Sequence, residues 1–518
     1  MQQPLPDDPA ALKALLLAER AAHAQTSERL QRAELQLAQA KVRMKALLKR
    51  YFGRSSEQLD PNQLQMAWAA VEADLAQPPA DSAPAAAATP PKPPRAGSPR
   101  RARRMEDLPV LETIVVDVPE DQKIGPDGTA LVKIRDEVTE EVDYQPGKLF
   151  RRRIVRPVYA SPAKDCSPRV ADLPPRVIPG GQAGPGLLAH VLISKYVDAL
   201  PLYRQAAMLE RLGPAFSRQA LGEWVEHGAA LLRGVHQHQQ RVVQQSRYVI
   251  GDETPIRVLD PARPGAAREA WLWTFLAPEQ HAIVFDFQLG RTHEPALAFL
   301  QDFQGVFQSD GFGGYTKALR LLPDRHRPGV LHTNCAAHAR RGFVAALDSG
   351  DERAAPFLAC FGALYEIEAE FRDADPAMRA TARSERSVPW LARLRAELDR
   401  AHADAAILPK SLLSNAVQYC LDRWEPLTRF AQPGFGHLQI DSNAVERAIR
   451  PSAVGKKNFL FVGHPDAGWR SAVLYSILGT CALLGVNPWA YLTWALPRLA
   501  GATNKTAAQF TPHRFLQR

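Results

Sequence analysis

The order of strand-like and helix-like segments predicts a mixed α+β chain. Three short apolar, β-branched runs come first, at 248–251, 271–276 and 282–287. A helical pattern follows at 294–303, and then two further strand-like runs at 306–308 and 330–333. Three antiparallel strands, a helix and further strands are the order of an RNase H-like sheet, so we expect a core of this type. We place this core in a domain spanning 241–470, with a helical insertion at about 350–435.

The first part of the chain, residues 1–60, is expected to form a coiled-coil helix. Residues 12–48 contain strong helix formers and neither proline nor glycine, and their apolar residues follow a three-four spacing. Polar residues interrupt that seam at Glu19, His23 and Thr26. We therefore do not expect a perfect zipper, but we still expect the helix to self-associate; an amphipathic helix folded back on its own core is the alternative. A basic linker rich in proline and alanine follows at 61–105.

Two small regions separate the linker from the predicted core. Residues 106–180 alternate short β-like runs with turns, which indicates a small β-rich module. Residues 181–240 are helical and fit a candidate helix-turn-helix for DNA binding, with 217–225 as its second helix. Plain helical packing would give the same pattern. After the core, residues 471–518 predict two packed C-terminal helices, broken near Gly485.

The composition bounds the class of protein. At 518 residues, with 46% hydrophobic and 23% charged residues, the chain can form several globular domains. No apolar run reaches the roughly 18 residues of a membrane span, and the start lacks the pattern of a signal peptide. The five scattered cysteines suit a reducing cytoplasm. A net charge of +9 favours a polyanionic partner such as DNA.

Two aspartates close predicted strands, and one glutamate lies in a predicted helix. Asp252 ends the run SRYVIGDET, Asp310 ends GVFQSDGFGGY, and Glu446 lies in IDSNAVERAIRP. Neighbouring strand ends meet at one edge of a sheet, where a packed helix can add the third carboxylate. Three such carboxylates can hold a pair of Mg²⁺ ions, which activate a nucleophile and stabilise a leaving oxygen in phosphoryl transfer. With the basic charge, this favours an enzyme that cuts and joins DNA.

Each of these carboxylates also has an ordinary structural explanation. Asp252 fits the start of a turn through Asp-Glu-Thr-Pro, and Asp310 fits a turn residue before Gly311. Glu446 fits an exposed helix residue paired with Arg450 at i,i+4. Other acids end apolar runs as well, namely Asp260, Asp286 and Asp302. Position in the sequence alone therefore does not select the three.

Basic and amide side chains accompany the third carboxylate. Asn443, Arg447 and Arg450 share one helical face with Glu446, as suits a metal ligand beside bound phosphates. Further candidates come from GKKNFLF and HARR, although ordinary surface charge explains such clusters equally well. The predicted DNA-binding residues are Asn443, Arg447, Arg450, Lys456, Lys457, His338, Arg340 and Arg341. Cys335 and His338 have ligand-like spacing, but no second pair accompanies them, so we expect no zinc there.

Several ordered motifs carry a resemblance to a known family. They are RYFGRSSEQLD, LLAHVLISKYVDALPLYRQ, GDETPIRVLD, QSDGFGGY, CAAHARRGF, DSNAVERAIRP and GKKNFLFVG. Over nearly its whole length the chain resembles transposases of the bacterial insertion sequence sixty-six family (TnpC-type). The resemblance implies a DDE transposase with Asp252, Asp310 and Glu446 as catalytic, metal-binding triad. It also implies Mg²⁺-dependent cleavage at the element ends, followed by attack of the freed 3′-hydroxyl on target DNA.

The resemblance also sets expectations for cofactors and partners. We expect two Mg²⁺ ions, with Mn²⁺ as a substitute. We expect DNA partners (terminal repeats and target DNA), a homo-oligomer, candidate accessory proteins of the same element, no membrane, and a place in the bacterial cytoplasm at the nucleoid. The family's β-rich module usually carries a zinc-ribbon-like set of cysteines, whereas 106–180 offers only Cys166. One thiolate cannot build a four-ligand site, so this module is a degenerate ribbon and no zinc is expected.

Two other kinds of protein fit the same features. One is a DNA-binding protein without turnover, for instance a regulator. The other is a structure-selective nuclease on the same RNase H-like scaffold. Cleavage followed by joining distinguishes the transposase from both.

Overall fold

The computed structural model describes most of the second two-thirds of the chain. Described are residues 176–518 without 182, 264, 324–328 and 504, and before them 147–150, 152, 154, 158–159, 169–170 and scattered positions between 13 and 42. The predicted linker, the motif RYFGRSSEQLD and most of the predicted β-rich module with Cys166 lie outside the described residues. The chain divides into two units, 1–70 with 152–518 and 71–151, and the sheet with its helices belongs to the first.

The described positions between 13 and 42 are helical, as the sequence predicts. Leu16, Leu17 and Leu37 are exposed there. Self-association of this helix remains a prediction. Of the predicted β-rich module, the structure describes one antiparallel pair, β1 (Val158–Tyr159) with β2 (Arg169–Val170).

A five-stranded mixed sheet forms the centre of the chain. Its strands are β3 (Tyr248–Leu259), β4 (Ala267–Ala277), β5 (Ala282–Gln288), β6 (Gly305–Ser309) and β7 (Val330–Asn334). They lie in the order β5-β4-β3-β6-β7, with β3, β4 and β5 antiparallel and with β6 and β7 parallel to β3. All five predicted strands are present, and the general α+β class is confirmed.

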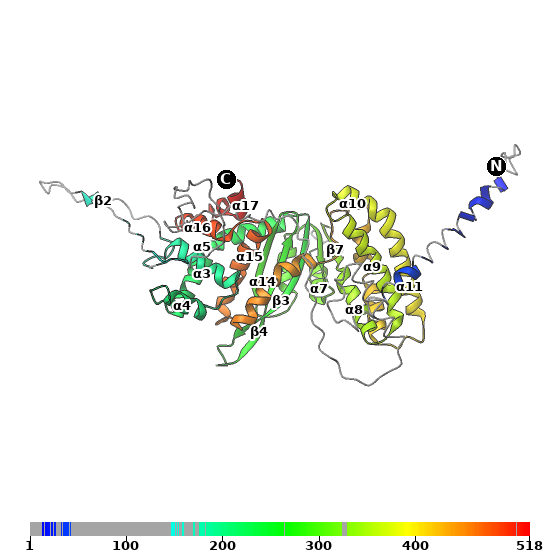
Figure 1. Cartoon of the computed structure of the whole chain (residues 1–518), viewed down its shortest axis with the longest axis horizontal. Helices are drawn as coiled ribbons and strands as arrows, with labels where there is room; N and C mark the ends of the chain where they lie inside the picture. Colours follow the sequence, from blue (N-terminus) through cyan, green and yellow to red (C-terminus); the bar gives the residue numbers. More distant parts are fainter. Residues whose placement is uncertain are drawn as a thin grey trace, which may run out of the picture. The chain divides into compact units, whose positions relative to one another are not determined.

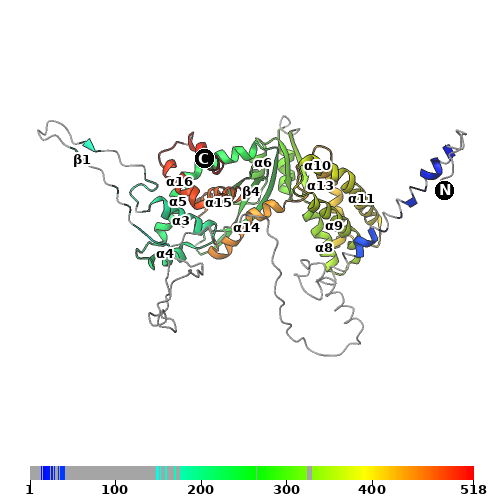
Figure 2. The same cartoon turned by 45° about the horizontal axis from the view of Figure 1, so that its top comes forward.

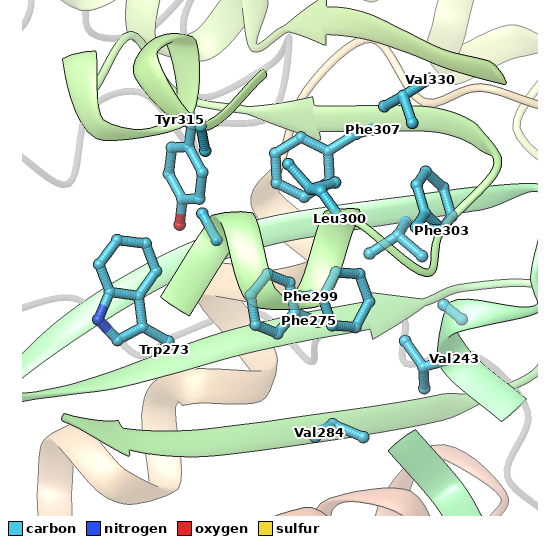
Figure 3. Packing of buried hydrophobic residues seen from close by; sticks show 14 of the residues in the cluster. Val243, Trp273, Phe275, Val284, Phe299, Leu300, Phe303, Phe307, Tyr315 and Val330 are labelled. Carbon is cyan, nitrogen blue, oxygen red and sulfur yellow. The ribbon is translucent and has the colours of Figure 1, made fainter. Parts of the chain in front are cut away.

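One face of the sheet carries an aromatic core under α6 (Glu294–Leu300) and α7 (Gly313–Leu321). Alternate residues of a strand point to the same face, so Trp273 and Phe275 of β4 enter this core together. The rings of Phe275 and Phe299 stack with centroids 3.8 Å apart, and Tyr315 packs edge-on against Trp273 (Figure 3). This packing fixes α7, and with it the segment that follows β6.

Helices that precede the sheet in the sequence and helices that follow it pack together along the edge strand β5. They are α5 (Arg218–Gln244) and α15 (Gly468–Leu483), with α3 (Pro185–Tyr196), α4 (Leu202–Glu210) and α16 (Pro488–Leu499) beside them (Figure 1). Hydroxyl groups of α15 accept hydrogen bonds from β5: Ser476 from the Phe285 N–H at 2.7 Å, and Thr480 from the Ile283 N–H at 3.1 Å. The free edge of β5 is thereby covered, which prevents this strand from pairing with other chains.

The segment predicted as a helix-turn-helix contains α4, a turn and α5, and DNA binding by it stays a prediction. Ser217 caps the N-terminus of α5, because its hydroxyl oxygen accepts a hydrogen bond from the Ala220 N–H at 3.0 Å. A helix therefore starts where the sequence predicts it. However, α5 continues for 27 residues and packs against α15 and β5. The predicted second helix, 217–225, is therefore the first part of a long structural helix, because no break follows Val225.

The elements of the predicted insertion are all helices or helical turns. After α8 (Ala336–Asp348) come a 3-10 turn (Glu352–Ala354), α9 (Ala355–Glu370), α10 (Pro376–Ala382), a π turn (Arg383–Ser387), α11 (Val388–Ala403), α12 (Leu412–Asp422), α13 (Trp424–Thr428) and a 3-10 turn (Arg429–Ala431). The chain returns to the sheet in α14 (Asn443–Phe459), and α17 (Pro512–Leu516) closes it. Figure 2 shows α8–α11 gathered as a helical body beside the sheet. As predicted, α15 and α16 form a C-terminal pair interrupted at Gly485.

The buried side chain of Arg383 holds the insertion to the segment that leads back to α14. Arg383 is 1% exposed, and its Nε and Nη2 donate to the two oxygens of Glu368, each at 2.7 Å. The same guanidinium donates to the carbonyls of Phe430 at 2.9 Å and Leu438 at 2.8 Å. A buried charge with this many partners is well compensated, so the return segment is fixed in place.

Asp252 does not end its strand, contrary to the prediction. It is the fifth residue of β3, whose ten registered pairs with β4 run from Ile250 to Leu259. The Thr-Pro that follows suggests a turn, but Pro255 is tolerated in the strand because β3 has no β6 partner beyond Ile250. In the described part of the chain, no helix has the length and apolar character to cross a bilayer.

Candidate active site

Asp252 and Asp310 occupy equivalent places on two neighbouring parallel strands. The registered pairs of β3 with β6 end at Ile250 and Gln308, and each aspartate follows that pair by two residues. Parallel strands run in step, so the two carboxylates leave the sheet at the same level. The structure thereby brings together two acids that the sequence separates widely.

The backbone at Asp310 is held by several contacts. Its Oδ1 accepts from the Phe312 N–H at 2.9 Å, and its carbonyl accepts from Asn334 Nδ2 at 3.1 Å. Gly311 lies under the ring of Tyr419 from α12, so closely that a Cβ there would sit 2.5 Å from a ring carbon. The helical insertion therefore contacts the segment that carries Asp310, and only glycine fits at position 311.

Glu446 reaches this edge because α14 is fastened at both ends. Near its start, the Ser442 N–H donates to Cys335 Sγ at 3.2 Å and Ile440 accepts from the Ala336 N–H at 3.1 Å. Near its end, the Lys456 ammonium donates to the Pro255 carbonyl at 2.9 Å. Glu446 lies in the first turn, where the partial positive charge of the helix N-terminus favours a carboxylate.

Asp252 interacts electrostatically with both other carboxylates. Burial, together with repulsion from Glu253, Asp310 and Glu446, raises the pKa of Asp252 to about 7. Within the described residues, neither Asp252 nor Asp310 forms an ion pair with a basic side chain. Of the three, only Glu446 has a positive neighbour, Arg341, whose Nη2 lies 3.8 Å from its Oε1; His338 Nε2 lies 3.9 Å from the same oxygen. The site therefore carries an excess of negative charge that a cation would relieve.

The donor chemistry suits a hard divalent cation. Carboxylate oxygens are the ligands that Mg²⁺ prefers, and the uncompensated acids at Asp252 and Asp310 favour a positive ion. Among the side chains that the structure describes, however, no group of three or more His, Cys, Asp or Glu is close enough to hold a metal ion together. The acids are gathered at one edge, but they are not preassembled around an ion.

The predicted DNA-binding residues fall into two groups. Arg341, Arg447, Arg450 and Lys457 are exposed, whereas His338, Arg340, Asn443 and Lys456 are half-buried. Asn443 donates to Asp441 Oδ2 at 2.7 Å, and Lys456 donates to β3. These two side chains thus have structural contacts within the protein. Burial and Arg341 lower the pKa of His338, so this ring is neutral at neutral pH.

Sequence reasoning missed the acid next to Asp252. Glu253 points to the opposite face of β3, into the aromatic core, where its side chain is only 1% exposed. It accepts from Tyr315 Oη at 2.6 Å and from Arg291 Nε at 2.8 Å. Strand alternation was the available signal, because a charged residue at an inward position must be paired.

The described cysteines are buried in the protein. Cys335 accepts the hydrogen bond from Ser442 and starts α8, so its thiol has a structural contact beside the site. Burial raises the pKa of Cys335, and it raises that of Cys360 and Cys420 to about 12 in each case. Thiols with such pKa values remain protonated and unreactive.

Comparison with known proteins gives consistent similarities. A family model described as the IS66 family of transposases matches residues 180–470, which contain the sheet, the insertion and α14. A second model, described as the homeodomain of transposase C of IS166, matches residues 39–113.

Proteins of Sinorhizobium fredii are similar over long stretches. The one named uncharacterized protein y4qI is 32% identical, over 96% of this chain and 95% of its own length. The one named uncharacterized protein y4jD is 31% identical, over 76% of this chain and 78% of its own length.

Proposed function

The chain belongs to the IS66 family of transposases, and on this premise we propose that it is a DDE-type enzyme that cleaves DNA at the ends of its insertion element and transfers the freed strand into target DNA. The single observation that carries this proposal is the register of β3 and β6, which places Asp252 and Asp310 at the same level of the sheet. The third acid, Glu446, comes from a helix delivered after the insertion. Metal-dependent phosphoryl transfer uses such a group of carboxylates.

The arrangement of the sheet supports an RNase H-like core. The first three strands of the sheet are antiparallel neighbours, and the last two add in parallel to the first of them. The helix α6 lies between the third and fourth strands in the chain. This is the order from which the sequence predicts such a core, and it leaves Asp252 and Asp310 side by side.

In the proposed reaction, Asp252, Asp310 and Glu446 would hold two Mg²⁺ ions, for which Mn²⁺ could substitute. When bound, such ions lower the pKa of the attacking hydroxyl and neutralise charge on the scissile phosphate and the leaving oxygen. The chain's own residues position the carboxylates: Asn334 and Phe312 fix the Asp310 segment, and Lys456 fixes α14. No zinc takes part in this proposal.

The exposed basic residues suit the DNA backbone. Arg447 and Arg450 lie one and four residues after Glu446 on α14, and Arg341 of α8 lies beside the same carboxylate. Arginine binds phosphate oxygens through a planar fork of donors, which positions DNA without reading its sequence.

We further propose that the chain works as a homo-oligomer through 1–60, with accessory proteins of the element as candidate partners, at the bacterial nucleoid.

A strand-transfer assay tests this function. The full chain is incubated with Mg²⁺, labelled element ends and target DNA, and Asp310→Ala is compared with Asp286→Asn. Asp286 is a matched control, because it is a half-buried acid on β5 whose carboxylate accepts from Gln288 at 2.7 Å. We expect cleavage and joining in the wild type and in Asp286→Asn, and neither step in Asp310→Ala.

Two outcomes would contradict the proposal. DNA binding without cleavage or joining would indicate a binding protein, and cleavage without joining would indicate a nuclease. Equal activity of Asp310→Ala and the wild type would remove Asp310 from the site.

A further inference from the structure

The backbone pairing of β3 with β6 stops before it reaches the two aspartates. The last registered pair is Ile250 with Gln308, and Asp252 and Asp310 both lie beyond it. Two carboxylates in this position repel each other when they are ionised. Because ladder pairing does not reach these residues, other contacts must hold the Asp310 segment next to β3.

The side chain of Glu253 makes the first of these contacts. Glu253 directly follows Asp252, and its Oε2 accepts the hydroxyl hydrogen of Tyr315 at 2.6 Å. Tyr315 belongs to α7, the helix that begins three residues after Asp310. This hydrogen bond therefore connects the residue after one aspartate to the helix after the other.

A second contact runs through Arg291. Its Nε donates to Glu253 Oε1 at 2.8 Å, and its guanidinium lies 4.0 Å from the ring centroid of Phe312. The backbone N–H of Phe312 donates to Asp310 Oδ1 at 2.9 Å. A guanidinium over an aromatic face is attracted to the ring, so Arg291 draws Phe312 and the Asp310 segment towards Glu253.

The surrounding core makes both contacts rigid. Gly251 lies on the same side of β3 as Glu253, and a Cβ there would sit 2.5 Å from the ring of Phe307. The missing side chain leaves room for Phe307 and Tyr315, whose rings are part of the core in Figure 3. Tyr315 is fully buried, and Glu253 is nearly so. A carboxylate in such a place has few alternative partners, so its position is well defined.

We propose that Glu253 is a positioning residue, which sets the spacing of Asp252 and Asp310 from the opposite face of the sheet through Tyr315 and Arg291. This inference rests on the proposed function, since the two aspartates are the metal-binding acids of that function. Glu253 itself points away from the edge where they lie, so it touches neither metal nor DNA. Its removal loosens the site without removing a ligand.

The test measures Mn²⁺ binding directly, besides activity. The full chain is titrated with Mn²⁺ while its unfolding temperature is followed, and cleavage of element ends is measured against Mg²⁺ concentration. The variants are Glu253→Gln and Tyr315→Phe, and the control is Glu279→Gln. Glu279 also forms a bidentate pair with an arginine, Arg247, but at an exposed position.

We expect Glu253→Gln to raise the Mn²⁺ concentration at half-saturation, and the Mg²⁺ requirement of cleavage, by about 10-fold, as removal of a residue that orients metal ligands does. Tyr315→Phe keeps the buried ring and shifts both in the same direction, so it tests the inference even if Glu253→Gln does not fold. Glu279→Gln leaves both unchanged.

A merely structural role would lower the unfolding temperature of both variants without changing either metal dependence, and that result would overturn the inference. It would leave the proposed function intact, because the wild type would still bind Mn²⁺ and cleave DNA. If the wild type itself neither bound Mn²⁺ nor cleaved, the proposed function would fail instead.

Discussion

The ammonium of Lys456 lies 3.0 Å from the hydroxyl oxygen of Thr254, two residues beyond Asp252 on β3. The same ammonium donates to the carbonyl of Pro255, and burial lowers its pKa. The helix that carries Glu446 is therefore fastened to the strand that carries Asp252. Lys457, its neighbour in the sequence, is exposed.

These two lysines should behave differently. Lys457→Met removes a proposed phosphate contact, so we expect weaker DNA binding, and a slope of log affinity against log salt concentration that is smaller by about 1. Lys456→Met should instead lower the free energy of unfolding and leave that slope unchanged. Binding titrations over a series of salt concentrations, with thermal unfolding of both variants, check this. Equal salt slopes for the two variants would contradict the assignment.

The buried Arg383–Glu368 pair should dominate the stability of the insertion. Arg383→Met leaves Glu368 buried without its partner, and it also removes the donors to Phe430 and Leu438. We expect a loss of about 3–5 kcal/mol in the free energy of unfolding, as for other broken buried pairs. Arg386→Met is the matched control, because the Arg386–Glu370 pair is exposed and should contribute at most about 1 kcal/mol. Denaturant unfolding of both variants measures the difference.

Gly311 should be intolerant of even one methyl group. In Gly311→Ala the added carbon meets the ring and hydroxyl of Tyr419, so the Asp310 segment must move. A displacement of about 1 Å at a catalytic group can lower the rate about 100-fold. Gly313→Ala is the control, because an added Cβ there has no atom within 4 Å. Partial recovery of cleavage in Gly311→Ala combined with Tyr419→Leu would identify the clash as the cause.

His332 should make the protein less stable in mild acid. Burial, with Arg429 and Arg423 contributing, lowers the pKa of His332 to about 4 from the ordinary 6.5. As the pH falls, the unfolded chain therefore binds a proton on this histidine before the folded chain does. The free energy of unfolding is unaffected by this difference above about pH 6.5. It decreases as the pH falls towards 4, by at most roughly 1.4 kcal/mol per pH unit.

The comparison with His332→Phe isolates this effect. Phenylalanine can keep the stacking of the ring on Phe307 but carries no titratable group. We expect the free energy of unfolding to fall less steeply with decreasing pH in the variant than in the wild type. Identical pH profiles would show that His332 does not titrate between the two limits.

The strands of the sheet could be predicted because each is a short β-branched run, but their ends could not. The run at 248–251 is followed by Asp-Glu-Thr-Pro, which indicates a turn from local preference alone. In the structure, pairing with β4 carries β3 on to Leu259, and the bridge of Val258 with Val462 supports its far end. Such tertiary pairing overrides local preference and is not visible in the sequence of one strand.

The three carboxylates could be predicted as a set, whereas their supports could not. Spacing and residue type suggested Asp252, Asp310 and Glu446, and the family resemblance selected the same three. Tyr419 and Arg383 come from the insertion, so their contacts with the Asp310 segment and the return segment depend on helix packing. Glu253 alone carried a detectable signal, as a charged residue on the inward face of a strand.

The late position of α14 in the chain has a consequence for synthesis on the ribosome. A nascent polypeptide that has emerged only as far as the insertion carries two of the three acids, and α15, which covers the edge of β5, has not yet been made. In the proposed function, such a partial product cannot cut the chromosome of its host. Competence for cleavage then arises only after α14 has emerged.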